Sequence, residues 1–306
     1  MPPNDVSLSP QPIERWSLRL SLAQPLSDVE HAGSMLRGAF GHALKALACA
    51  CGGEPHIPGC HYQQIFEPLP PIDWPSRYRD CPPAYVLTPP AAESYSRTQL
   101  DFDFTLLGPS LAQRALVWEA WQLAAQRGFG NRRIPARLEA VAHSTQPTAL
   151  LASRQVRLQL TSPLLLKRKQ AGQSRSEPLG PCALGVGDLL IALHRRLNLT
   201  QRLYGVPATP LLPLEQWLAL GDSLDLQASL QETHFSRHSN RQQQHMPLYG
   251  LSGTIDLRGP LDPTLLAALT LGQWLHIGGK TALGLGGYKL QGSAAPAMCL
   301  TLEDSL

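Results

Sequence analysis

Residues 276–290 read HIGGKTALGLGGYKL, a stretch in which glycines are mixed with two lysines, a threonine and a tyrosine. It fails two common nucleotide-binding patterns. A phosphate-binding loop of the form G-x-x-x-x-G-K-[ST] needs a glycine where Trp274 stands, and a dinucleotide fingerprint needs one where Lys289 stands. Two interpretations remain, because consecutive glycine amides can form a nest for an anion or simply turn the chain between two elements.

The end of this stretch, LGLGGYK (283–289), has a counterpart in RGFGNRR (127–133). In both halves a helical pattern leads into G-x-G, and a strand pattern follows. The preceding elements also share one order: strand, helix, two strands, helix. This is the ferredoxin-like βαββαβ unit, which packs both helices on one face of its sheet and leaves the other face free to bind. We predict an α+β fold of two tandem ferredoxin-like (RRM-like) domains, residues 1–150 and 151–306.

Hydrophobic periodicity places the individual elements. In the first half we expect a strand at 14–26, a helix at 31–50, an irregular segment at 51–82, strands at 83–89 and 100–108, a helix at 109–127 and a strand at 137–143. In the second half we expect a strand at 153–163, a helix at 185–205, strands at 223–234 and 246–257, a helix at 262–275, the glycine-rich loop and a last strand.

The charge distribution permits a polyanion partner. The 306 residues carry a net charge of +3 and are 43% hydrophobic, values typical of a globular and mildly basic protein. The segments 140–176, 233–255 and 263–302 hold no Asp or Glu. A folded domain could merge their positive side chains into one surface.

Basic residues of these segments are the candidate RNA contacts. Lys167, Arg168 and Lys169 suit either a phosphate-gripping loop or a solvated linker. Arg237 and Arg241 lie between two strands, where a polar hairpin turn is the alternative. In the opening stretch, glycines would let an RNA backbone approach and lysines would meet its phosphates; these residues are Gly278, Gly279, Lys280, Gly284, Gly286 and Lys289.

The helix at residues 31–47 has two contrasting faces at about 100° per residue. The expected core face consists of Leu36, Ala39, Phe40, Ala43, Leu44 and Leu47. The other face consists of Arg37, Gly38, Gly41, His42 and Lys45, with His31 joining them if the helix begins that early. Glycine inside a helix costs about 1 kcal/mol relative to alanine, so a ligand or another backbone is expected to approach this face closely. His42 between Arg37 and Lys45 suits acid–base cleavage of a phosphodiester, although a polar surface histidine is the alternative.

The cysteines allow either free thiols or a metal site. The N-terminus MPPNDVSLSP has no charged and apolar leader, and no apolar run approaches the roughly 20 residues of a membrane span, so we expect a cytoplasmic protein with no membrane partner and no disulfides. Four cysteines lie within 33 residues: Cys49, Cys51, Cys60 and Cys81. Their spacing differs from standard zinc knuckles, so we expect thiols that pack a loop and keep zinc as the alternative.

Taken together, these segments resemble the CRISPR repeat-processing endoribonucleases of the RAMP superfamily. The resemblance rests, in chain order, on LRGAFGHALKALAC, CHYQQIFEP, PPAYVLTPP, RGFGNRR, TSPLLLK, LHRRLNLTQRLYG, RHSNRQ and LHIGGKTALGLGGYKL. The glycine-rich tail is the family's hallmark, and its occurrence together with LRGAFG near the N-terminus makes the resemblance more specific.

The resemblance implies two ferredoxin-like domains that bind a CRISPR repeat and cut it once without metal or cofactor. The 2′-OH attacks, a 2′,3′-cyclic phosphate remains, and the guide RNA product joins other CRISPR effector subunits. His42 occupies the place of the family's helix histidine, and His31 is the nearest candidate for the tyrosine that often precedes that helix. Relatives that rely on arginines would instead promote Arg37 and Arg241. A non-catalytic subunit that only holds the repeat hairpin is the alternative.

Overall fold

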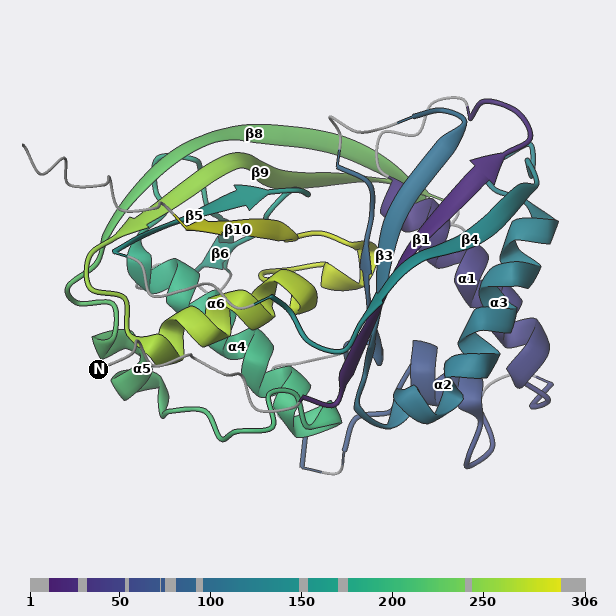
Figure 1. The fold of residues 1–306 in the computed structure, drawn as a ribbon, viewed down its shortest axis with the longest axis horizontal. Helices are drawn as coiled ribbons and strands as arrows, with labels where there is room; N and C mark the ends of the chain where they lie inside the picture. The colour runs from purple at the N-terminus through teal and green to yellow at the C-terminus, as the bar shows by residue number, and fades with distance from the viewer. Residues whose placement is uncertain are drawn as a thin grey trace, which may run out of the picture.

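Two four-stranded antiparallel sheets form the framework of the chain (Figure 1). The structure is a computed structural model that describes residues 11–26, 32–52, 55–71, 73–74, 81–91, 96–148, 154–169, 176–239 and 244–292. The first sheet is complete at Ser144 and the second begins at Gln155. In the described part of the chain no helix is both long and apolar enough to cross a membrane.

The first sheet has the strand order β2-β3-β1-β4. Its strands are β1 (Ile13–Leu22), β2 (Tyr85–Thr88), β3 (Gln99–Leu107) and β4 (Ala136–Ser144). Its helices are α1 (Ala32–Ala48), the short α2 (His61–Phe66), the 3₁₀ segment η2 (Gly108–Gln113) and α3 (Arg114–Arg127). Figure 1 shows α1 and α3 side by side against this sheet, and their apolar stripes close one core over it.

The second sheet has the strand order β10-β5-β9-β8. Its strands are β5 (Gln155–Leu160), β8 (Asp225–Ser239), β9 (Gln244–Arg258) and β10 (Tyr288–Gly292). The other elements of this half are the two-residue strands β6 (Lys167–Arg168) and β7 (Glu177–Pro178), the helices α4 (Val186–Tyr204), α5 (Leu214–Ala219) and α6 (Pro263–Leu275), and the 3₁₀ turn η3 (Thr281–Leu283). Numbered within its own half, each sheet has the order 4-1-3-2, which confirms the predicted tandem ferredoxin-like fold.

Three features differ from the sequence prediction. The short helices α2 and α5 were not predicted, because six residues are too few for a helical period to show. Strands β8 and β9 each run for fifteen residues, so their hairpin extends beyond the expected strand ends. Leu47, assigned to the core face of α1, is 44% exposed; it lies in the last turn of the helix, where Ala48 is only half-buried as well.

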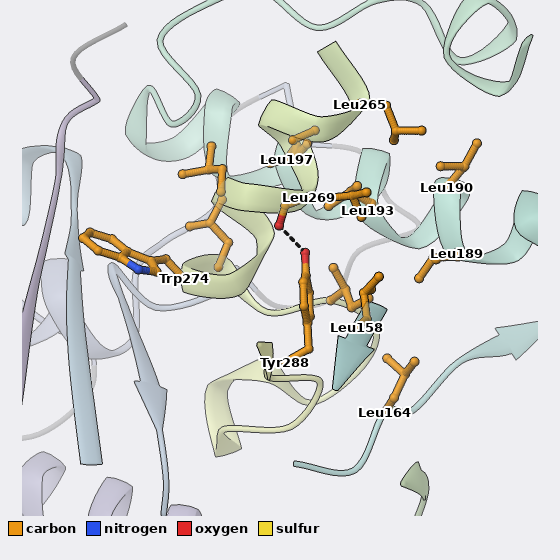
Figure 2. Close-up of a cluster of buried hydrophobic side chains, with 14 of the residues drawn as sticks. Leu158, Leu164, Leu189, Leu190, Leu193, Leu197, Leu265, Leu269, Trp274 and Tyr288 are labelled. Carbon is orange, nitrogen blue, oxygen red and sulfur yellow. Dashed lines mark hydrogen bonds between the residues drawn. The ribbon is translucent and has the colours of Figure 1, made fainter. Parts of the chain in front are cut away.

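The core of the second half lies between its sheet and the helices α4 and α6 (Figure 2). Leu158 from β5 meets leucines of both helices, and the Tyr288 ring stands among them. The Tyr288 hydroxyl donates to the Leu269 carbonyl at 2.6 Å. A Cβ on Gly272 would lie 2.2 Å from that hydroxyl, so glycine is needed there to admit the tyrosine.

The outer face of the first sheet is partly occupied by the second half of the chain. Residues that alternate along β2 have different surroundings: Tyr85 and Leu87 belong to the core under α1 and α3, whereas Val86 packs into the core of the second half. Ile13 and Leu107 pack into the same core as Val86. The prediction of a free sheet face is therefore wrong for the first domain, because apolar side chains on that face bury themselves against the second.

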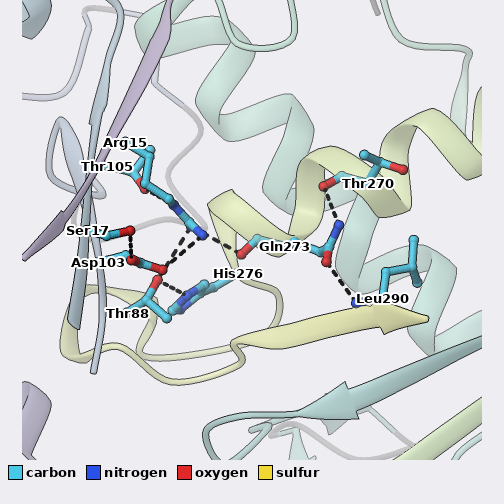
Figure 3. Close-up of polar contacts among 9 residues, drawn as sticks. All are labelled: Arg15, Ser17, Thr88, Asp103, Thr105, Thr270, Gln273, His276 and Leu290. Carbon is cyan, nitrogen blue, oxygen red and sulfur yellow. Dashed lines mark hydrogen bonds and ion pairs between the residues drawn. The ribbon is translucent and has the colours of Figure 1, made fainter. Parts of the chain in front are cut away.

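A largely buried arginine crosses this junction (Figure 3). Arg15 Nε on β1 donates to Thr105 Oγ1 at 2.9 Å, and one terminal nitrogen lies 3.3 Å from the Asp103 carboxylate. The other terminal nitrogen donates to the Gln273 carbonyl at the end of α6, at 3.3 Å. Burial lowers the Arg15 pKa to about 10, with Asp103 acting in the opposite direction, so the side chain stays charged at neutral pH.

A histidine of the second half completes the junction. His276 is fully buried, and its Nε2 lies 2.9 Å from Thr88 Oγ1 at the end of β2. Its Nδ1 lies 3.1 Å from the Leu285 carbonyl. Close by, a Cβ on Gly284 would come within 2.5 Å of Pro89. His276 and Gly284, both from the HIGGKTALGLGGYKL stretch, thus pack against the end of β2.

Replacing Arg15 by alanine should lower the free energy of unfolding by about 2 kcal/mol, since Asp103 and Thr105 lose charge-assisted hydrogen bonds at a buried junction. Arg19→Ala is the matched control, because Arg19 pairs with Asp101 on the same two strands but is exposed. We expect little or no change in its urea midpoint. Equal midpoints for the two variants would contradict a structural role for Arg15.

Candidate functional site

A cleft of about 1490 Å³ lies between the two halves of the chain. The first half contributes α1 through Arg37 and the segment from Phe66 to Pro70. The second half contributes the β6 hairpin, one side of α4 and the loop from Gly278 to Leu283. The cleft is larger than the roughly 300–1,000 Å³ of typical small-molecule pockets.

Arg37 of α1 lies in the wall of the cleft that the first half of the chain contributes. Its guanidinium carbon lies 4.4 Å from the centre of the Phe66 ring, a cation–π contact. Its Nε is buried and has no hydrogen-bond partner among the described residues. Burial raises the pKa of the neighbouring Tyr85 phenol and the Arg37 charge opposes that effect, so the phenol stays protonated at neutral pH. Arg37 is therefore a partly buried cation whose Nε has unused hydrogen-bonding capacity.

Four exposed cations form the opposite wall: Lys167, Lys169, Arg195 and Lys280. They come from the β6 hairpin, α4 and the glycine-rich loop, three segments far apart in sequence. Within the described part of the chain none of them has a carboxylate within ion-pair distance of 4.0 Å. Like charges repel at such a wall, and an anion entering the cleft relieves that repulsion.

Two arginines of the same region, Arg168 and Arg196, are instead hydrogen-bonded to other groups of the protein. Arg168 Nε donates to Asp188 Oδ1 at 2.8 Å, and its other side contacts the second carboxylate oxygen. Burial acts to raise the Asp188 pKa, but the hydrogen bonds from Arg168 and Gly185 outweigh it and hold that pKa low. Arg196 is buried and donates from Nε to the Leu275 carbonyl at 2.8 Å. Arg168 therefore ties the β6 hairpin to α4, and Arg196 ties α4 to α6.

The glycines of the opening stretch are explained largely by contacts within the protein. Gly278 has φ +81°, and a Cβ there would lie 2.6 Å from the Leu165 carbonyl. Gly279 donates its amide to that same carbonyl at 2.8 Å. Gly284 and Gly286 are buried, and a Cβ on Gly286 would lie 1.8 Å from the Ile277 carbonyl. Gly278, Gly279 and Lys280 line the cleft, whereas Gly284 and Gly286 hold the loop together behind it.

The exposed face of α1 is narrower than its sequence pattern indicated. His42 and Lys45 are exposed, and the Lys45 ammonium lies 5.4 Å from the Tyr62 ring centre. Gly41, however, is buried, and a Cβ on it would lie 2.3 Å from the Phe66 ring. A side chain of the protein, not a ligand, is what requires this glycine. His42 is not among the residues that line the cleft.

The remaining predicted site residues lie away from the cleft or have no described side chain. Lys289 is exposed on β10, away from the lining of the cleft. Arg237 is in β8, but its side chain is not described. His31 and Arg241 lie outside the described residues.

Of the four cysteines considered as zinc ligands, three lie close together at the end of α1. Among the described residues, Cys49, Cys51, His56 and Cys60 each offer one ligand atom, and these atoms all lie within 4.8 Å of one another. Cys81 lies apart from this group and lines the cleft. His56 was not predicted as a partner, although it stands between Cys51 and Cys60 in the sequence.

Arg195 is the cleft residue that sequence reasoning missed. It is one of two adjacent arginines in LHRRLNLTQRLYG. Neighbouring helical residues are about 100° apart, so one arginine of such a pair can face the core while the other faces the cleft. The helical period of α4 alone was therefore a usable signal, because Leu189, Leu193 and Leu197 mark its buried side.

Family comparisons cover nearly the whole chain. A family model described as an N-terminal domain matches residues 11–163. The model described as CRISPR-associated endoribonuclease Cas6 matches residues 158–288. A search of the curated proteins finds no match.

Several solved structures of Cas6 proteins have a similar fold. A Cas6 product complex has a TM-score of 0.56 at 16% identity, covering 90% of this chain and 100% of that one. Thermus thermophilus Cas6 has a TM-score of 0.51 at 15% identity, covering 92% of this chain and 100% of that one. A chain of a partial Cas6-RT-Cas1–Cas2 complex has a TM-score of 0.55 at 15% identity, with 94% of this chain matching 47% of that one. At these identities the likeness concerns the fold.

Gly41→Ala should lower the free energy of unfolding by about 1–3 kcal/mol, because the new methyl group displaces the buried Phe66 ring. Gly38→Ala is the control, since a Cβ there meets nothing within 4 Å. Alanine at that position should raise the free energy of unfolding by up to about 1 kcal/mol. Thermal or urea unfolding measures both, and a stabilised Gly41→Ala variant would contradict the packing described for Phe66.

Proposed function

We propose that the chain, a Cas6-like protein, binds a CRISPR repeat RNA in the cleft between its two domains and cleaves the precursor once to give a guide RNA. The observation that carries this proposal is the convergence of Arg37, Lys167, Lys169, Arg195 and Lys280 on one cleft. RNA presents a continuous row of phosphates, and a polyanion satisfies several separated cations at once.

The shape of the site also favours a polymer. The cleft exceeds the volume of a typical small-molecule pocket, and its cations come from both halves of the chain. A small anion would meet one or two of these cations, whereas an RNA strand or stem can span both walls.

We further propose metal-independent cleavage, with His42 as the general acid or base. The 2′-OH of the nucleotide before the scissile phosphate loses its proton and attacks the phosphorus, and the 5′-oxygen leaves with a proton. The products are a 2′,3′-cyclic phosphate and a free 5′-OH. Histidine suits these proton transfers near neutral pH, and Arg37 and Lys45 on the same helix would stabilise the charge on the phosphate.

A second function, binding without cleavage, is favoured by the position of His42. This histidine is exposed on α1 but does not line the cleft. A repeat held in the cleft must therefore extend over α1 for its scissile phosphate to reach His42. If it does not, the chain is a repeat-binding subunit. One matched chain belongs to a Cas6-RT-Cas1–Cas2 complex, which supports association with further CRISPR proteins in either case.

Cleavage separates the two functions. The labelled repeat RNA of the same genomic locus should be cut once in EDTA, and the same RNA with deoxyribose at the scissile nucleotide should stay intact. His42→Ala should lower the single-turnover rate by about 100-fold or more, the usual contribution of a general acid or base. The exposed His61 of α2 provides the control variant, His61→Ala, which should cut normally.

Cutting of the deoxy substrate, or activity that is lost in EDTA and restored by Mg²⁺, would contradict the proposed chemistry. An undiminished His42→Ala rate would remove His42 from the mechanism. Binding of the intact repeat with no cleavage under any condition would establish the second function.

Binding to the cleft should depend on salt. Lys280→Ala and Arg195→Ala should each weaken repeat binding and reduce the slope of log K against log salt by about one. Lys289→Ala is the control, because Lys289 is an exposed lysine near the same loop but outside the cleft. Filter-binding titrations between 50 and 300 mM salt, roughly the range over which phosphate contacts are lost, measure this. Equal slopes for all three variants would place the RNA elsewhere.

A further inference from the structure

A second site, separate from the cleft cations, lies where α1 ends. α1 finishes at Ala48, and Cys49 and Cys51 follow directly. His56 and Cys60 come next, and α2 begins at His61. The described residues of this connection have no regular structure, yet they bring three sulfurs and an imidazole together. Closing a loop of this length costs conformational entropy, so an interaction between its residues must offset that cost.

The distances within this cluster fit a tetrahedral metal site. Cys49 Sγ lies 3.3 Å from His56 Nδ1, and Cys60 Sγ lies 3.7 Å from the same nitrogen. Zinc–sulfur bonds of about 2.3 Å and zinc–nitrogen bonds of about 2.0–2.1 Å place neighbouring ligand atoms about 3.5–3.8 Å apart. All four ligand atoms lie within 4.8 Å of one another, so small side-chain rotations bring them onto one ion.

The backbone around the cluster is shaped to bring the ligands together. Gly52 directly follows Cys51 with φ +69°, and Gly59 directly precedes Cys60 with φ +85°. Among the described residues, no atom lies within 4 Å of the missing Cβ of either glycine, so close packing does not explain them. Each instead turns the chain sharply beside a ligand, in a conformation that other residues rarely adopt.

Two further contacts distinguish a metal site from packed thiols. The Ile57 amide donates to Cys51 Sγ at 3.4 Å, a hydrogen bond that suits a thiolate acceptor better than a thiol. His56 directs Nδ1 at the sulfurs, while its Nε2 is buried with no partner among the described residues. One imidazole nitrogen can accept from one thiol only, yet two thiols lie within hydrogen-bond distance of Nδ1 and the third sulfur lies within 4.8 Å of the group. A shared cation accounts for this arrangement.

We propose that Cys49, Cys51, His56 and Cys60 bind one zinc ion as a structural site. Three thiolates and one imidazole are a soft, closed ligand set, which selects zinc over magnesium or calcium and leaves no open position for catalysis. This differs from the sequence prediction, because His56 takes the fourth place that Cys81 was considered for.

The ion would join the end of α1 to the start of α2. α2 carries Phe66, whose ring packs on Gly41 and lies under Arg37. Pro55 and His56 themselves line the cleft. Zinc would therefore hold one wall of the cleft in place without touching the RNA, and the proposal does not depend on whether that RNA is cleaved.

The test uses the full chain, purified reduced, with zinc measured by elemental analysis. We expect one zinc per chain. Replacing that zinc with Co²⁺ should give the absorption bands of tetrahedral cobalt together with a sulfur-to-cobalt charge-transfer band. Cys60→Ser should lose both signals. Cys81→Ser and Cys182→Ser are the controls and should keep them, because Cys81 lies outside the cluster and Cys182 is exposed in the second half.

If Cys60→Ser does not fold, titration of the metal-stripped wild-type chain with Co²⁺ gives the same readout without a variant. Saturation at one equivalent with a charge-transfer band would support the site. A chain that is purified without zinc and gives no such band would overturn it. So would a metal that remains in Cys60→Ser or is lost from Cys81→Ser.

Discussion

The hydrogen bonds of Arg15 across the domain junction are the constraint on which the rest of the structure depends. Arg15 belongs to β1, one of the two inner strands of the first sheet, and it reaches the last turn of α6 in the second half. Burying a guanidinium is costly unless its donors are satisfied, and here Thr105, Asp103 and the Gln273 carbonyl satisfy them. The observed placement of the two halves achieves this. That placement also forms the cleft.

The cleft follows from this placement, because neither domain could form it alone. α1 supplies Arg37, and the second domain supplies the β6 hairpin, α4 and the glycine-rich loop. The loop is held from behind by His276 and by glycines that admit neighbouring backbone, so Lys280 is presented at its edge. Charges that repel one another are thus fixed in place by neutral and apolar contacts elsewhere. A phosphate backbone is the partner that this arrangement favours.

The fold could be predicted from the sequence, whereas only part of the candidate site could. Alternation in β1 and β3 and the helical periods of α1 and α4 are local signals, and their repeated order determined the topology. The glycines were predicted to admit a ligand or an RNA backbone, because the sequence shows that a Cβ is missing but not which atoms occupy the space. For Gly41 it is Phe66, and for Gly286 it is the Ile277 carbonyl. The sequence indicated three of the exposed cations that line the cleft, Lys167, Lys169 and Lys280. It could not show which arginines are already hydrogen-bonded to other groups of the protein, because that depends on tertiary contacts.

Photo-crosslinking tests the central claim, that the RNA occupies the cleft between the domains. A repeat RNA carrying 4-thiouridine at each uridine in turn would be crosslinked to the full chain, and the attached peptides identified by mass spectrometry. The account predicts crosslinks in both domains, near Phe66 on one wall and in the loop at Gly278–Lys280 on the other. Crosslinks confined to one domain, or to the exposed surface of β4, would contradict it.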